Sequence, residues 1–211
     1  MVSEMWPLSL SDAEYFSTAD YGLMGLLEVT SQILIAVMGL SLYSGLIRWY
    51  WDAEYRDKQK TIFFTTLLFT ILTSLCIGSV LWLNVGELSA LLVQQEGYSL
   101  GGELPYILQL LILTSMLGAV VEVPQNLLRL QRKPIYYSLT NIVRLFVTLV
   151  LTIYFTISLH RGVSGVYEAQ LVGIVIQLLM VLPLVIKNSS CRVDRKCTIQ
   201  LLVYSYPLVF P

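Results

Sequence analysis

Residues 129–155 read RLQRKPIYYSLTNIVRLFVTLVLTIYF, in which a basic cluster runs directly into a long apolar segment. Arg129, Arg132 and Lys133 form the cluster, and the apolar segment from residue 135 to 157 exceeds the roughly 20 residues that a helix needs to cross a bilayer. One further cation, Arg144, lies nine residues past Ile135, inside the apolar segment. This pattern predicts a membrane-spanning helix with a charge in its interior.

Four other apolar runs of comparable length occur along the 211-residue chain, of which 56% is hydrophobic and 13% charged. A soluble domain carries about a quarter charged residues. The runs do not show the alternation, over segments of about ten residues, that is typical of an outer-membrane barrel. We expect one all-α domain, a polytopic transmembrane helix bundle with five full spans and a partial sixth. The expected spans are 23–47, 62–83, 104–128, 135–157, 163–186 and the partial 198–211.

The distribution of charge predicts an orientation. Eleven of the 13 Lys and Arg residues lie in three loops, 48–60, 129–134 and 187–197. Short loops rich in Lys and Arg stay in the cytoplasm, so we expect these three on the cytoplasmic side of the inner membrane. The opposite side then holds the loop 84–103, in which residues 86–95 are apolar enough to form a short interfacial helix.

Several function classes have no support in the motifs. The chain contains no GxxxxGK[ST] phosphate loop, no HExxH motif and no GxSxG nucleophile elbow. Its three cysteines and one histidine do not form a pattern of metal ligands. We therefore expect a protein that is not an enzyme, needs no cofactor or metal, and does not bind nucleic acid.

Two ionisable residues in neighbouring runs lie at similar depth. Glu122 is seven residues before Arg129, or about 10 Å along a helix, and Arg144 is about 13 Å past Ile135. Either charge alone would cost several kcal/mol in the membrane interior. Two interpretations stay open: an ion pair that only locks two helices together, and a polar, partly cationic cavity that meets an anionic headgroup.

Polar side chains recur around Arg144 at intervals of three and four residues, which places them on one face of a helix. Glu122 has polar neighbours on its own face as well, including Arg129. We expect both faces to line a cavity. Two other intramembrane carboxylates, Glu28 and Glu168, are expected to reach the interface or to make local hydrogen bonds. The candidate binding residues from this pattern are Glu122, Thr140, Asn141, Arg144 and Thr148.

Four stretches together resemble the oligosaccharide flippases of polysaccharide biosynthesis, the O-antigen flippase type of the multidrug/oligosaccharidyl-lipid/polysaccharide exporter superfamily. The closest is residues 129–155 followed by HRGVSGVYEAQLVGIVIQLL (160–179), a basic Lys-Pro loop, a helix, a short glycine turn and a helix rich in small residues. The others are FSTADYGLMGLLEV (16–29), IRWYWDAEYRDKQKTIFFTTLL (47–68) and LLVYSYPLVFP (201–211).

The resemblance implies a two-lobed helical fold, of which this chain would be a piece from about the second helix to the start of the seventh. It implies transport of an undecaprenyl-pyrophosphate-linked oligosaccharide across the bilayer, alongside other membrane proteins of polysaccharide assembly. Cavities of that family are commonly cationic, which suits a pyrophosphate. The resemblance adds Arg48 and Arg129 as cytoplasmic-side phosphate contacts, with Arg144 in the cavity.

Three other functions stay open. A drug/cation antiporter of the same superfamily would favour membrane carboxylates without the arginine. A membrane glycosyltransferase or polymerase of the same pathway would need a large outer loop, and the loop 84–103 is short. A scaffold that transports nothing is the last.

Overall fold

The computed structural model describes residues 18–39, 46, 59–96 and 102–188. Within these ranges the regular elements are all helices, and five of them are long and apolar enough to cross a membrane. The expected all-α polytopic bundle is confirmed. The elements are α1 (Thr18–Gly39), α3 (Gln59–Leu83), α4 (Val85–Glu96), α5 (Leu104–Leu130), α6 (Pro134–Ile153), the π-helical turn η3 (Tyr154–Ser158) and α7 (Gly162–Asn188).

The predicted spans lie close to the observed helices, since α3, α5, α6 with η3, and α7 cover the runs 62–83, 104–128, 135–157 and 163–186. Helix α1 begins five residues before the predicted 23–47, and its described part ends at Gly39. Helix α4 occupies the segment expected to form a short helix at 86–95. The partial span 198–211 and most of the loops 48–60 and 187–197 lie outside the described residues.

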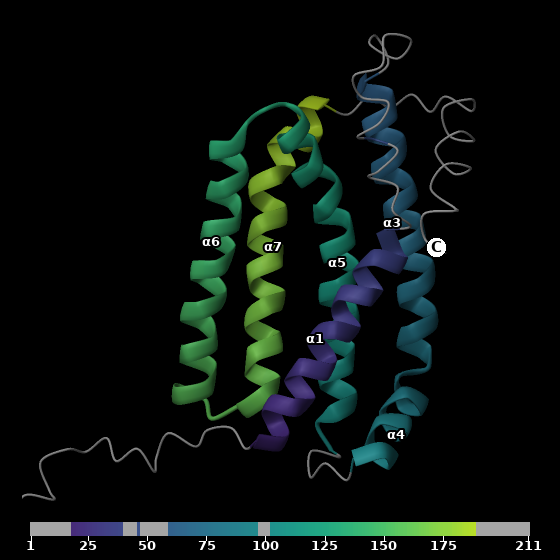
Figure 1. The fold of residues 1–211 in the computed structure, drawn as a ribbon, viewed down its shortest axis with the longest axis vertical. Helices are drawn as coiled ribbons and strands as arrows, with labels where there is room; N and C mark the ends of the chain where they lie inside the picture. Colours follow the sequence, from purple (N-terminus) through teal and green to yellow (C-terminus); the bar gives the residue numbers. More distant parts are fainter. Residues whose placement is uncertain (1–17, 40–45, 47–58, 97–101, 189–211) are drawn as a thin grey trace, which may run out of the picture.

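Helix α5 is the centre of the bundle. It packs against α3 on one side and α7 on the other, while α1 crosses it on one face (Figure 1). Of the five long helices that the structure describes, α5 is the most buried and α6 the least. Two apolar clusters hold α5 in place, one around Phe63 and Leu127 and the other around Leu27 and Ile107. The core therefore forms along α5, and the helices around it can leave space between their polar faces.

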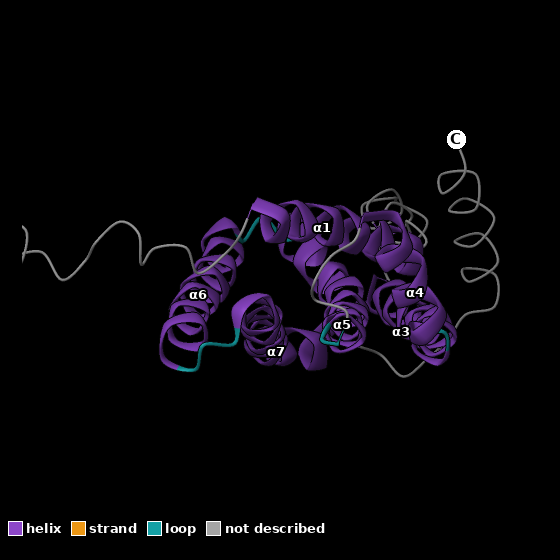
Figure 2. Cartoon of the chain, turned by 90° about the horizontal axis from the view of Figure 1, so that it is seen from below, coloured by secondary structure: helices purple, strands orange, loops and turns teal. Residues whose placement is uncertain are grey.

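Helix α6 lies at the edge of the bundle, where it packs mainly against α7 and meets α5 near the turn that joins them (Figures 1 and 2). Only Thr140 of α6 is buried, and large apolar side chains such as Leu145 and Phe146 stay exposed. In a membrane these side chains would contact lipid acyl chains. Tyr137, Asn141, Arg144 and Thr148 lie on another face of α6, which is turned toward α1, α5 and α7.

A tight turn joins α5 to α6. The backbone N–H of Lys133 donates to the carbonyl of Leu128 at 3.1 Å, and that of Arg132 donates to the carbonyl of Arg129 at 3.1 Å. This is a Schellman arrangement, in which the residue after the helix cap takes the left-handed conformation that favours glycine. Here that residue is Arg132, with φ of 53°. The left-handed conformation costs an arginine about 1 kcal/mol more than a glycine.

Candidate functional site: a polar cavity inside the bundle

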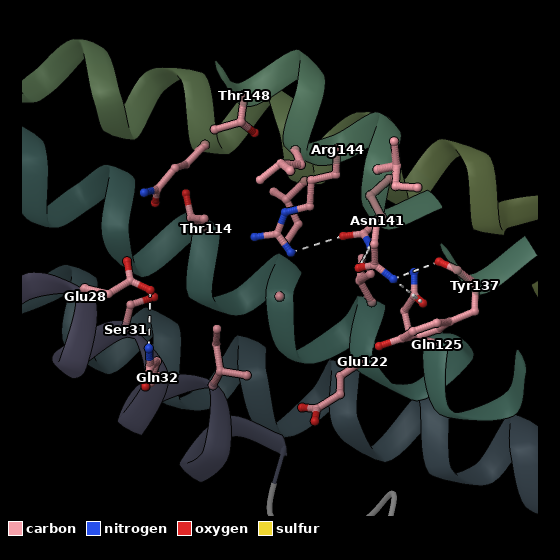
Figure 3. Close-up of a pocket in the computed structure, with 18 of the residues that line it drawn as sticks. Glu28, Ser31, Gln32, Thr114, Glu122, Gln125, Tyr137, Asn141, Arg144 and Thr148 are labelled. Carbon is pink, nitrogen blue, oxygen red and sulfur yellow. Dashed lines mark hydrogen bonds between the residues drawn. The ribbon is translucent and has the colours of Figure 1, made fainter. Parts of the chain in front are cut away.

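A cavity of about 690 Å³ lies between α1, α5, α6 and α7 (Figure 3). Its volume falls in the range of about 300–1,000 Å³ that is common for small-molecule sites. Of its 19 lining residues, 13 have side chains with polar or charged groups, although all four helices are apolar overall. The polar and charged members are Glu28, Ser31, Gln32, Thr114, Glu122, Gln125, Arg129, Tyr137, Asn141, Arg144, Thr148, Gln170 and Gln177.

Helix α6 contributes its polar face to this cavity. Tyr137, Asn141, Arg144 and Thr148 are spaced by four, three and four residues, so a 3.6-residue period brings them onto one stripe. Thr140 is fully buried beside the stripe, where its hydroxyl accepts a hydrogen bond from Gln125 Nε2 at 3.0 Å. Thr140 therefore supports the cavity wall and does not line it.

A chain of side-chain hydrogen bonds between lining residues connects three helices around the cavity. Asn141 Oδ1 on α6 accepts from Gln177 Nε2 on α7 at 3.1 Å, and Gln177 Oε1 in turn accepts from Arg144 Nη1 at 3.2 Å. Gln177 is 1% exposed, so both ends of its amide are satisfied inside the protein. Asn141 Nδ2 also donates to Gln125 Oε1 of α5 at 3.5 Å, and Gln125 Nε2 donates to Thr140, so the network also reaches the central helix. Such satisfied buried networks hold the participating side chains in fixed positions.

Arg144 keeps donors available to the cavity. A guanidinium group has five N–H donors in a planar fork. Among the residues that the structure describes, Gln177 is the one hydrogen-bond partner of the Arg144 side chain. Two hydroxyls of lining residues, Thr114 Oγ1 and Thr148 Oγ1, have no hydrogen-bond partner within the described residues, but both oxygen atoms are buried and are not accessible from the cavity. The donors that this part of the wall can offer to a ligand are therefore those of Arg144.

The expected ion pair between Glu122 and Arg144 is not formed. Both residues line the cavity, but no salt bridge joins them, and across the described ranges Arg161 with Glu168 is the salt bridge that forms. The prediction assumed that α5 and α6 are packed neighbours because a short turn connects them. Instead α6 packs mainly against α7 and meets α5 near the turn that joins them, while the Arg144 head is held by Gln177 of α7. The interpretation that a Glu122–Arg144 ion pair locks α5 to α6 is thus wrong.

Arg129 marks the end of the cavity nearest the basic turn. Its guanidinium lies over the Tyr137 ring, with Cζ 4.6 Å from the ring centroid, and also donates to the Tyr137 hydroxyl. A cation in this position is attracted by the negative face of the ring. The structure thus places Arg129 in the site together with Glu122, Asn141, Arg144 and Thr148. Arg48, the remaining candidate, lies outside the described residues.

Sequence reasoning missed the contributions of α1 and α7. Glu28, Ser31 and Gln32 of α1 line the cavity, and so do Gln170 and Gln177 of α7. A signal was present in each case. The three α1 residues recur at intervals of three and four, and the two glutamines are seven residues apart, so each set lies on one helix face.

The charges of the lining residues balance, because Glu28 and Glu122 accompany Arg129 and Arg144. The cavity is therefore polar with separated positive and negative positions, and the partly cationic cavity expected from the sequence acquires a second acidic residue, Glu28. The described residues contain no group of three or more His, Cys, Asp or Glu side chains that could hold a metal ion.

The fold and site together define a class: a multi-pass α-helical membrane protein with a polar cavity between its helices. Comparisons with protein-family models, with curated proteins and with solved structures found no match. Function is therefore argued from the cavity itself.

Proposed function

We propose that the protein is a flippase that moves a lipid-linked oligosaccharide with an anionic pyrophosphate group across the cytoplasmic membrane. The observation that carries this proposal is the position of Arg144, in the wall of a polar cavity between apolar helices and with donors left over after its bond to Gln177. An arginine in this setting is costly and marks a ligand pathway more often than a purely structural contact.

A pyrophosphate fits the donors of this wall. Phosphate oxygens accept two parallel hydrogen bonds from one guanidinium, and such charge-assisted bonds are about twice as strong as neutral ones. The amides of Gln32 and Gln170 provide both donors and acceptors, which suits sugar hydroxyls. A substrate with a charged link and a polar glycan would use both kinds of group.

The proposed orientation follows from the basic turn. With residues 129–134 in the cytoplasm, Arg129 stands at the cytoplasmic end of the cavity and Arg144 lies deeper along α6. The pyrophosphate would contact Arg129 first and Arg144 next. The resemblance of the sequence to oligosaccharide flippases supports the same assignment and suggests other membrane proteins of polysaccharide assembly as partners.

Reconstitution tests the transport step directly. We expect the protein, expressed from its complete gene and placed in liposomes, to expose a fluorescent undecaprenyl-pyrophosphate-linked oligosaccharide to dithionite quenching from both leaflets. Protein-free liposomes should lose only the fluorescence of the outer leaflet. Equal movement of a fluorescent phosphatidylcholine would contradict a flippase, because it would show unselective lipid scrambling.

A cation antiporter is a second candidate, and one observation favours it. Glu28 and Glu122 both line the cavity, and the Glu122 carboxylate has no hydrogen bond or salt bridge with any residue that the structure describes. An unpaired carboxylate within a membrane can bind a cation or carry a proton. The flippase remains the better proposal because the same cavity holds Arg144, which would repel an organic cation.

Proton-coupled efflux of ethidium from everted vesicles separates the two functions. We expect no efflux above vesicles without the protein, and no change when Glu122→Gln or Glu28→Gln is introduced. Glu168→Gln is the matched control, because Glu168 pairs with Arg161 and does not line the cavity. Efflux that Glu122→Gln abolishes and Glu168→Gln preserves would establish the antiporter instead.

A further inference from the structure

A second groove, of about 600 Å³, lies where the beginning of α6 meets the end of α7, next to the turn that joins α5 to α6. We call it the basic groove. It shares no lining residue with the polar cavity. Its rim carries Arg132, Lys133 and Lys187, and its floor is formed by Leu128, Pro134, Ile135, Tyr136, Leu139, Pro183 and Leu184.

The charge of the groove has one sign. Three cations line it and no carboxylate does. Orientation of the protein in the membrane requires only that cations lie in the loop, and it does not require that cations from two separate helix ends surround one apolar hollow. Lys187 lies in the last turn of α7, whereas Arg132 and Lys133 lie before α6, so only the packing of α6 on α7 brings the three together.

The backbone at Arg132 shapes the rim. Arg132 occupies the left-handed position of the Schellman turn, with φ of 53°. The turn fixes the direction in which the chain leaves α5, and with it the place of two of the three cations on the rim.

The floor of the groove is apolar and exposed, and a hydrogen bond between α6 and α7 stabilises it. Ile135 is 84% exposed and Leu139 is 48% exposed, although both are large hydrophobic residues. The Tyr136 hydroxyl donates to the backbone carbonyl of Met180, which joins α6 to α7 along the groove. An apolar surface of this kind beside cations, at the end of membrane-spanning helices, lies at the level of lipid headgroups and upper acyl chains.

We propose that the basic groove binds one anionic phospholipid of the surrounding bilayer. Arg132, Lys133 and Lys187 contact its phosphodiester headgroup, and an acyl chain lies along Leu139 and Pro183. Such a lipid would fill the seam between α6 and α7, the pair of helices that holds Arg144 in position. The site stands whether or not the protein is a flippase, because none of its residues belongs to the polar cavity.

Native mass spectrometry of the purified protein titrated with phosphatidylglycerol or phosphatidylcholine tests the site. We expect one phosphatidylglycerol to bind in preference to phosphatidylcholine. The variant Arg132→Gln/Lys133→Gln/Lys187→Gln should bind phosphatidylglycerol roughly 100-fold more weakly. Each of the three cations attracts the anionic headgroup to a similar extent, so each should account for a similar share of the lost affinity. The control Lys60→Gln/Arg161→Gln removes two cations that line neither the groove nor the polar cavity and should keep the preference. Equal losses in both variants would overturn the proposal, because they would show attraction by net charge alone.

A change in the floor tests the apolar half of the groove without changing any charge. Leu139→Trp should fill the floor and weaken phosphatidylglycerol binding, whereas Leu149→Trp, on the same helix and outside both cavities, should not. Both sites are exposed, so neither variant should disturb folding, which circular dichroism checks. Unchanged binding by Leu139→Trp would overturn the groove as the site.

Discussion

Arg144→Gln is expected to weaken binding of undecaprenyl pyrophosphate by about 100-fold and to abolish flipping. A hydrogen bond to a charged group contributes about 1.5–3 kcal/mol, so the loss of one guanidinium that donates to a pyrophosphate corresponds to roughly 10-fold to 150-fold in affinity. Glutamine removes the charge but keeps a polar group within reach of Gln177, the hydrogen-bond partner of Arg144. Isothermal titration of the purified protein measures the change.

Two comparisons show whether the effect is specific. Arg161→Gln makes the same substitution at an arginine that pairs with Glu168 away from the cavity, and it should leave the affinity unchanged. Undecaprenol, which lacks the pyrophosphate, should bind the Arg144→Gln variant as well as it binds the original protein. If Arg144→Gln lowers the melting temperature and leaves pyrophosphate affinity intact, Arg144 is a structural residue and the proposed function fails.

Gly173→Ala should destabilise the protein by about 1–3 kcal/mol, the usual cost of forcing one extra carbon into a packed interface. A Cβ at Gly173 would collide with Thr148 Oγ1 and stand 3.5 Å from the carbonyl oxygen of Arg144. The absence of a side chain at Gly173 thus permits the close approach of α7 to α6, and the cavity wall depends on that approach. Thermal unfolding in detergent, followed by circular dichroism, gives the size of the effect.

The double variant Thr148→Ala/Gly173→Ala should recover most of that stability, because it removes the hydroxyl with which the new methyl group collides. Gly25→Ala is the matched control, since a Cβ there meets nothing within 4 Å. Equal melting temperatures for Gly173→Ala and Gly25→Ala would show that the two helices can separate without cost, and the account of close packing at Gly173 would be wrong.

Much of the architecture could be predicted because the residue types along each helix depend on what surrounds that helix, lipid, protein or a polar cavity. The runs around Phe63, Leu111 and Val181 are long and apolar because lipid or protein surrounds the helix on all sides. The stripe from Tyr137 to Thr148 could be predicted to face a cavity for a similar reason, since polar groups on one helix face must avoid lipid. The prediction of the spans and the prediction of the polar face both depend only on the spacing of residues within one segment of the chain.

The partners of each charge could not be predicted in the same way. Glu122 and Arg144 lie at similar depths on consecutive helices, yet α6 packs mainly against α7 and Gln177 of α7 holds the arginine. Glu28 enters the cavity from α1, a helix that is distant in sequence from α6. The neighbours of each helix are decided by how well whole helix surfaces fit together, including the close contact at Gly173. The spacing of residues along one helix does not show which other helix it will contact.

By itself, then, the sequence determined the helical membrane bundle, the places of its described helices and the polar face that carries Arg144. The tertiary structure decided which charges share a cavity, that Glu122 and Arg144 do not pair, and that Arg132, Lys133 and Lys187 surround one groove. The physical reason is that apolar length and helical periodicity act within a segment, whereas the order of helices around α5 depends on contacts between segments far apart in the chain.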